Sequence, residues 1–365
     1  MSTKKRIIFL DLMRAFAVLM MVQGHTIHTL LAEEYRSADY LFYSIWVSLR
    51  GFTAPIFMFT SGVVFTYLLG SNFSSFRDNP RVKKGIKRFL LLLVIGYLLR
   101  YPTYKVFDFS YVTDKQWLMF FAVDALHLIA FGLLFILIFV YISEKTGFKK
   151  SVVLIFGALF FILLYPITKN INWADIFPLP VAAYFYSDTG SLFPLFPWAG
   201  YVVGGGILGN YIAKNPVIVS SKDFSFRLLL TGICFAAFSF FISQLGKIIS
   251  VYDSSWSYSL SMVFYRIGIV LVLNGIMSLI AVKTRDIPNV IKQIGRHTLL
   301  IYVVHLIMLY GCAWIPGMYK FYSQTFSFEL TLVSAVVMLL LMISMVVVFE
   351  KIKLVRKNKI SAATV

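Results

Sequence analysis

The sequence predicts an all-α protein that crosses a membrane about ten times and forms one domain over residues 1–365. Three observations support this. Hydrophobic residues make up 59% of the chain and charged residues only 14%, a balance typical of integral membrane proteins. Apolar runs of membrane length recur along the whole sequence. Lys and Arg gather in alternate loops between these runs, as they do in multi-pass proteins.

Each apolar run is long enough to form most or all of a helix across the hydrocarbon core of a bilayer. In chain order the runs are 7–31, 44–69, 89–104, 117–142, 152–168, 195–212, 228–249, 259–282, 298–315 and 328–349. The first run lacks a small-residue cleavage site, so we expect a retained helix and no cleaved signal peptide. The aromatic, Pro-bearing segment 169–194 is either an interfacial belt or a lid on the outer side.

The basic residues orient the runs. They cluster in six segments: 4–6, 77–88, 145–150, 214–227, 283–296 and 351–359. By the positive-inside rule both termini are cytoplasmic, and we expect the cell membrane as the location. The same pattern accounts for the net charge of +18. Because these charges lie in short loops beside membrane ends, we expect contact with the bilayer and no nucleic-acid partner.

Two cysteines, Cys234 and Cys312, both lie in apolar runs. Their positions give neither a disulfide framework nor the spacing of metal ligands. We therefore expect no metal site.

The first run carries two ionisable residues on one face. Eleven positions separate Arg14 from His25, which is almost three whole helical turns and about 16 Å along the axis. Asp11 precedes Arg14 by one turn and can pair with it, and His28 follows His25 on nearly the same face. Ionisable groups inside membrane helices are costly and tend to mark a functional path.

Counting the rise per residue places further polar residues at two depths. Arg14 and His305 are expected about 10 Å from the cytoplasmic side. Arg50 begins the second run on the outer side. The outer level, about 10–15 Å from the external face, holds His25, Asp124, His127 and Arg266.

Each of these residues also has a structural interpretation. Arg14 and Asp11 can form an ion pair without further role, and Arg50 can reach the interface along its aliphatic stem. His127 and His305 fit the description of hydrogen-bonded core histidines.

Four segments resemble known sequences. LDLMRAFAVLMMVQGH (10–25), with ten residues between its Arg and its His, resembles the signature of membrane-bound acyltransferases of family 3. Three more segments resemble the related heparan-alpha-glucosaminide N-acetyltransferase-like branch. They are RGFTAPIFMFTSGVVF (50–65), FPLFPWAGYVVGGGILG (193–209) and IGRHTLLIYVVHLIMLY (294–310).

The resemblance implies transfer of an acyl group, usually acetyl, across the membrane. The donor it implies is cytoplasmic acyl-CoA, and the acceptor is a hydroxyl or amine of an extracytoplasmic glycan or related molecule. By the same resemblance His25 is the catalytic histidine and Arg14 is the arginine paired with it.

The chemistry of this reaction assigns roles to the polar residues. A neutral imidazole can take the proton of the attacking hydroxyl or amine, and an acyl-histidine intermediate is an open alternative. With His25 we expect Asp124 to orient an imidazole. The oxyanion is stabilised either by Arg266 or by backbone N–H groups at a helix break. Basic inner residues suit the phosphates of CoA, and the expected donor-binding residues are Arg14, Asp11, His305 and Arg296. The expected acceptor-binding residues are His28, Arg50, His127 and Trp198.

A transporter or flippase for a small polar or glycan-type solute is the competing interpretation. Ten spans, buried charges and an external lid would serve it equally well. The sequence shows no pair of broken helices in corresponding halves, which would indicate an inverted-repeat transporter.

Overall fold

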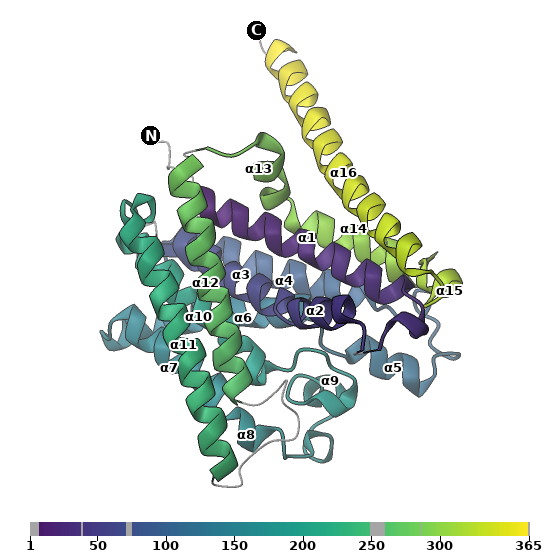
Figure 1. Cartoon of the computed structure of the whole chain (residues 1–365), viewed down its shortest axis with the longest axis horizontal. Coiled ribbons are helices and arrows are strands. Elements are labelled where there is room, and N and C mark those ends of the chain that lie inside the picture. Colours follow the sequence, from purple (N-terminus) through teal and green to yellow (C-terminus); the bar gives the residue numbers. More distant parts are fainter. Residues whose placement is uncertain (1–6, 38, 71–74, 249–259, 285, 364–365) are drawn as a thin grey trace. The chain divides into compact units, whose positions relative to one another are not determined.

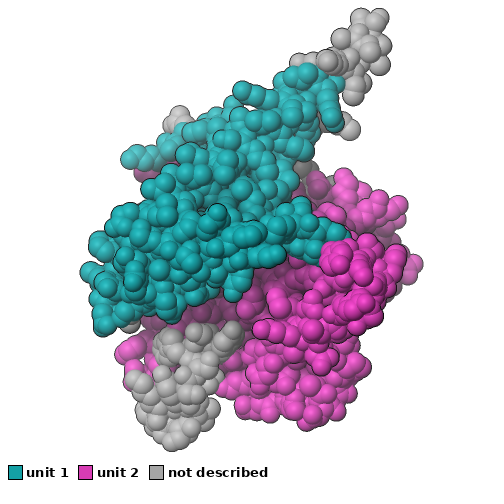
Figure 2. All heavy atoms as spheres, turned by 90° about the vertical axis from the view of Figure 1, so that its right-hand side faces the viewer, with its two compact units in different colours: residues 1–53, 283–365 teal, residues 54–282 magenta. Residues whose placement is uncertain are grey.

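The computed structural model describes residues 7–37, 39–70, 75–248, 260–284 and 286–363. These form two compact units, which Figure 2 colours separately. Unit 1 is Met1–Thr53 with Lys283–Val365, and unit 2 is Ala54–Val282. The basic residues 4–6, position 285 of the basic segment 283–296, the last position of the predicted run 228–249 and the first position of the run 259–282 lie outside the described residues. The single domain stays a prediction.

Unit 1 joins the two ends of the chain. Its helices and its one hairpin are α1 (Ile8–Leu30), η1 (Glu33–Tyr35), α2 (Leu41–Arg50), α13 (Asn289–Arg296), α14 (Thr298–Tyr310), β1 (Gly311–Cys312), β2 (Ile315–Pro316), α15 (Tyr319–Tyr322) and α16 (Phe328–Ala363).

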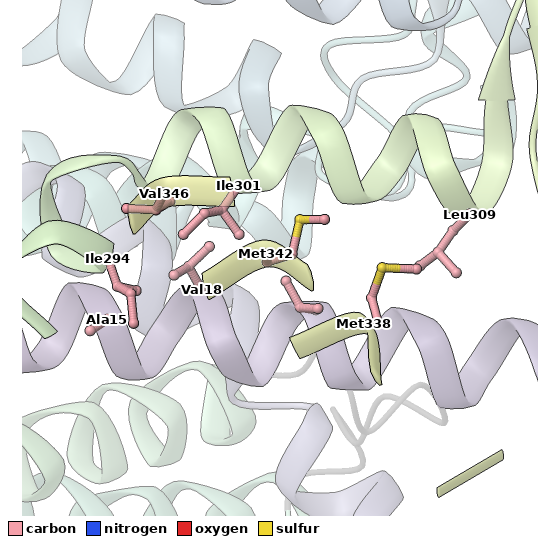
Figure 3. Close-up of a cluster of buried hydrophobic side chains, with 9 residues drawn as sticks. Ala15, Val18, Ile294, Ile301, Leu309, Met338, Met342 and Val346 are labelled. Carbon is pink, nitrogen blue, oxygen red and sulfur yellow. The ribbon is translucent and has the colours of Figure 1, made fainter. Parts of the chain in front are cut away.

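Helices α13, α14 and α16 all contact α1 (Figure 1). Their shared core is a cluster of buried aliphatic and Met side chains (Figure 3): Ala15, Val18, Val22, Ile294, Ile301, Leu309, Met338, Met342 and Val346. At the end of α1, Leu31 forms a backbone bridge with Phe326, directly before α16. The cluster therefore fixes α14 beside the face of α1 that carries the ionisable residues.

Unit 2 is built from the middle of the chain. Its elements are α3 (Thr53–Gly70), α4 (Pro80–Leu99), α5 (Asp114–Phe121), α6 (Ala125–Thr146), α7 (Lys150–Leu163), α8 (Tyr165–Thr168), η2 (Trp173–Asp175), α9 (Leu179–Ala182), η3 (Ser187–Thr189), α10 (Leu195–Lys214), η4 (Ile218–Ser220), α11 (Lys222–Ile248) and α12 (Leu260–Thr284).

Within unit 2, helices α6, α7 and α10 pack against one another, and α4 packs against α6. Glycines let α10 approach α3 backbone to backbone. A Cβ at Gly62 would clash with the carbonyl oxygen of Val202, and a Cβ at Gly209 would clash with that of Val63. Small residues commonly serve this purpose between membrane helices, where close van der Waals packing replaces the hydrophobic effect.

The structure confirms an all-α polytopic membrane protein. Among the described residues, seven helical segments are long and apolar enough to cross a membrane. One of them runs through α2 and α3, Leu41–Gly70. The other three predicted spans correspond to α4, α10 and α14, of which α14 is a shorter apolar helix. The count of ten and the cytoplasmic termini stay predictions.

Two predicted helices are interrupted. The run 44–69 consists of α2 and α3, with a turn at Gly51 and Phe52 between them, so Arg50 ends α2 and does not begin a helix. The run 117–142 is divided into α5 and α6. Asp124 is the N-cap of α6 because its carboxylate accepts hydrogen bonds from the first backbone N–H groups of that helix.

Candidate functional site

Arg14 and His25 both face α14, which confirms that they share one face of α1. Arg14 Nη2 donates a hydrogen bond to Thr298 Oγ1 at 3.3 Å, at the start of α14. His25 Nδ1 lies 3.1 Å from Tyr310 Oη, at the end of α14. The two bonds occur in the same order along both helices, so α1 and α14 run parallel.

His25 lies among aromatic rings of α14. The centroid of its imidazole is 5.5 Å from that of His305, with a tilt of 41° between the ring planes. The ring of Tyr310 meets it edge-on, at 5.8 Å and 89°. His25 itself is half-buried. A second imidazole and a phenol thus lie beside this imidazole.

His305 is fully buried, and one of its ring nitrogens is fixed. Its Nδ1 lies 2.8 Å from the carbonyl oxygen of Ile301, one turn earlier in α14. For Nε2 of this ring, no hydrogen-bond partner lies among the described residues. Leaving a buried acceptor without a partner costs about 1–3 kcal/mol.

The prediction that His305 lies at the depth of Arg14 was wrong. That depth would hold if the run 298–315 began at the membrane face. The structure instead sets Thr298, the first residue of α14, beside Arg14, which is already some way along α1. Seven residues further on, about 10 Å along the axis, His305 reaches His25.

A second polar cluster lies one turn beyond His25. Arg50, at the end of α2, is 2.8 Å from His28 Nδ1 through its Nη1. Because a guanidinium only donates, this nitrogen of His28 is the acceptor. The same guanidinium lies 5.4 Å from the ring centre of Trp46, and Trp46 Nε1 donates to Gln23 Oε1 at 3.0 Å.

Arg36 holds the end of α1. Its Nε and Nη2 donate to the carbonyl oxygen of Leu31 at 3.0 and 2.8 Å, and Nη2 also donates to that of His28 at 2.6 Å. These carbonyls lack intrahelical partners at a helix C-terminus. The sequence reasoning did not select Arg36 or Tyr310, although Tyr310 closes the segment 294–310.

The predicted donor-binding residues of α1 and α13 lie close together. Asp11 is buried, and Gly295 of α13 lies against its backbone, since a Cβ there would be 2.9 Å from the Asp11 carbonyl oxygen. Arg296, the next residue, is exposed. The donor-binding roles of these residues stay predictions.

In unit 2, Asp124 orients the imidazole of His127. Asp124 Oδ1 accepts from His127 Nδ1 at 2.9 Å, and Asp124 Oδ2 accepts from Arg100 Nε at 3.3 Å. His127 is fully buried, and the ring of Tyr97 lies 4.4 Å from it. This group also ties α4 to the start of α6.

Arg266 and Trp198 form a separate pair in unit 2. The guanidinium of Arg266 on α12 lies 5.5 Å from the ring centre of Trp198 on α10. A cation over an indole face is an attractive electrostatic contact. The predicted meeting of His25 with Asp124, His127 and Arg266 stays a prediction.

Over the described ranges, no group of three or more His, Cys, Asp or Glu side chains could hold a metal ion.

The sequence matches the catalytic domain of heparan-alpha-glucosaminide N-acetyltransferase over residues 6–244. That range is more than half of the chain. The chain belongs to this family. Membership of this family identifies the protein as a membrane acyltransferase. The matched range includes Arg14, His25 and Arg50, whereas His305 and Tyr310 follow it in the sequence. No curated protein matches the chain.

Proposed function

We propose that this acyltransferase moves an acetyl group from cytoplasmic acetyl-CoA to a hydroxyl or amine of an extracytoplasmic glycan. The observation that carries the proposal is the shared face of Arg14 and His25 along α14, inside the range that matches the family. A donor can then be held at the Arg14 level, while its thioester reaches the His25 level about 16 Å away.

His25 is the general base in this proposal. The attacking oxygen or nitrogen loses its proton to the imidazole as it bonds to the thioester carbon. The carbon–sulfur bond then breaks, and the same proton passes to the CoA sulfur. Tyr310, 3.1 Å from His25 Nδ1, orients the ring as it takes the proton.

Arg14 serves the donor. Its guanidinium is permanently charged and suits a phosphate or an amide oxygen of the pantetheine arm. Thr298 Oγ1 accepts one of its hydrogen bonds, which positions the guanidinium along α14. Basic residues of the segments 77–88 and 283–296 raise the local concentration of the anionic nucleotide.

The test uses purified protein in detergent with radiolabelled acetyl-CoA and a panel of glycans bearing free hydroxyls or amines. Labelled acceptor is the expected product, and His25→Ala should abolish it while the protein stays monodisperse and binds CoA. Wild-type turnover by folded His25→Ala would contradict the role of His25. Movement of an intact solute across vesicles, without any acyl transfer, would instead identify a transporter.

A further inference from the structure

The buried imidazole of His305 stands beside His25 without a role in the function proposed above. Three observations concern it. Its Nδ1 meets the Ile301 carbonyl oxygen at 2.8 Å, its side chain is fully buried, and its Nε2 has no hydrogen-bond partner among the described residues.

The contact with Ile301 decides the tautomer of His305. A carbonyl oxygen can only accept, so Nδ1 must carry the hydrogen. In a neutral imidazole the lone pair then lies on Nε2. His305 therefore offers one proton acceptor in a buried place, and its ring centre is 5.5 Å from that of His25.

His25 needs such an acceptor in the reaction. Once it has taken the proton of the attacking group, it is a half-buried cation, and a charge withdrawn from water is disfavoured unless a polar group accepts its hydrogen. Serine hydrolases meet this need with a carboxylate beside the histidine. The ring contacts and hydrogen bonds of His25 instead involve His305 and Tyr310.

We propose that His305 is the positioning partner of His25 and shares the proton that His25 takes from the acceptor. In the tautomer required here, His25 Nδ1–H donates to Tyr310 Oη, so His25 Nε2 carries the lone pair and receives the proton. A rotation of the His25 side chain brings this N–H to the lone pair on His305 Nε2. The proton then returns through His25 to the CoA sulfur, and no net charge is left on either ring. This inference rests on the proposed acyl transfer.

The variant His305→Gln tests the pair. Its side chain is close in length and keeps polar atoms near the position of Nε2, but it cannot take up a proton. His305→Phe is the apolar counterpart. The control is His297→Gln, which removes the imidazole directly before the same helix, where it is bound to Glu350 at 2.6 Å. All three proteins are first checked for monodispersity and for CoA binding.

We expect His305→Gln to lower kcat by about 10- to 100-fold, part of the 10²–10⁴ typical of general base catalysis. The KM for acetyl-CoA should change less than twofold in His305→Gln, as it should in the control His297→Gln. His305→Phe should lose more than His305→Gln. The solvent isotope effect on kcat, measured in H₂O and D₂O, should be larger in the wild type than in His305→Gln, because in the wild type the same proton is passed on a second time.

An equally large solvent isotope effect in His305→Gln, or a kcat equal to that of the wild type, would overturn the pairing. So would a loss confined to the KM of the donor. Solid-state NMR of ¹⁵N-labelled histidine provides a readout without turnover. The His25 ring signals should shift in His305→Gln and not in His297→Gln. If the wild type transfers no acetyl group but this shift occurs, the proposed reaction fails while the ring pair stands.

Discussion

Replacing Tyr310 with Phe removes one oxygen from the surroundings of His25 and little else. The aromatic ring stays, so its edge-on contact with the imidazole, at 5.8 Å and 89°, is retained. The contact with His25 that is lost is the 3.1 Å hydrogen bond between Tyr310 Oη and His25 Nδ1, and the phenol also interacts with Thr29 of α1. Tyr310 is 41% exposed, so the fold should tolerate Phe at this position.

The size of the effect follows from that one bond. A neutral hydrogen bond contributes about 0.5–1.5 kcal/mol, which corresponds to about a 2- to 13-fold change in rate. We expect kcat to fall by this factor and the KM for acetyl-CoA to stay constant, because the donor is bound at the Arg14 level. The measurement is steady-state transfer of labelled acetyl to a soluble glycan acceptor.

Tyr319→Phe is the matched control. This phenol neighbours Tyr310, with ring centres 6.2 Å apart, and is 53% exposed, so its removal should leave kcat unchanged. Equal rates in Tyr310→Phe and the wild type would refute the idea that the phenol orients His25. A drop of more than 100-fold would show that Tyr310 itself takes part in the chemistry.

Three further predictions concern the donor, the core and the sidedness. Arg14→Gln should weaken CoA binding about 12- to 160-fold, the equivalent of 1.5–3 kcal/mol for a charged hydrogen bond, and unchanged calorimetric affinity would assign Arg14 to structure. Met342→Ala should destabilise the folded protein by about 1.7 kcal/mol, which is a cavity of about 70 Å³ at about 24 cal/mol per Å³. Only the cavity is counted, because lipid supplies no hydrophobic term. Thermal unfolding measures the loss and should show none for Leu340→Ala, whose side chain is 57% exposed. In vesicles of known orientation, product should form when acetyl-CoA and the glycan are on opposite faces, and product formed solely with both on the cytoplasmic face would contradict transfer across the membrane.

Helix class and the face shared by Arg14 and His25 could be predicted because both depend on local pattern. Long apolar runs with basic loops specify membrane helices, and a spacing of eleven residues returns to the same side of a helix. Both properties are independent of how distant helices pack. The structure confirms them through the contacts of these two residues with α14.

The partners of His25 could not be found in this way. The level of His305 depends on where α14 starts relative to α1, which is set by lateral packing of the core around Val18 and Ile301. Sequence counting assumed that the run 298–315 began at the membrane face. Asp124 was likewise taken as part of a helix, whereas its carboxylate caps α6 and binds His127. Side-chain capping competes with helix continuation, and apolar periodicity does not record it.

The construction of unit 1 from both ends of the chain has a consequence for biosynthesis. His25 and Tyr310 are separated by 285 positions, and all of unit 2 lies between them in the sequence. At 5–20 residues per second, a ribosome needs about 15–60 seconds to make that stretch. Throughout this interval the nascent chain carries the histidine without the phenol and imidazole of α14. Under the acyl transfer proposed above, a partly synthesised chain lacks a complete centre and cannot hydrolyse thioester there, and activity begins only when the last helices have joined the first.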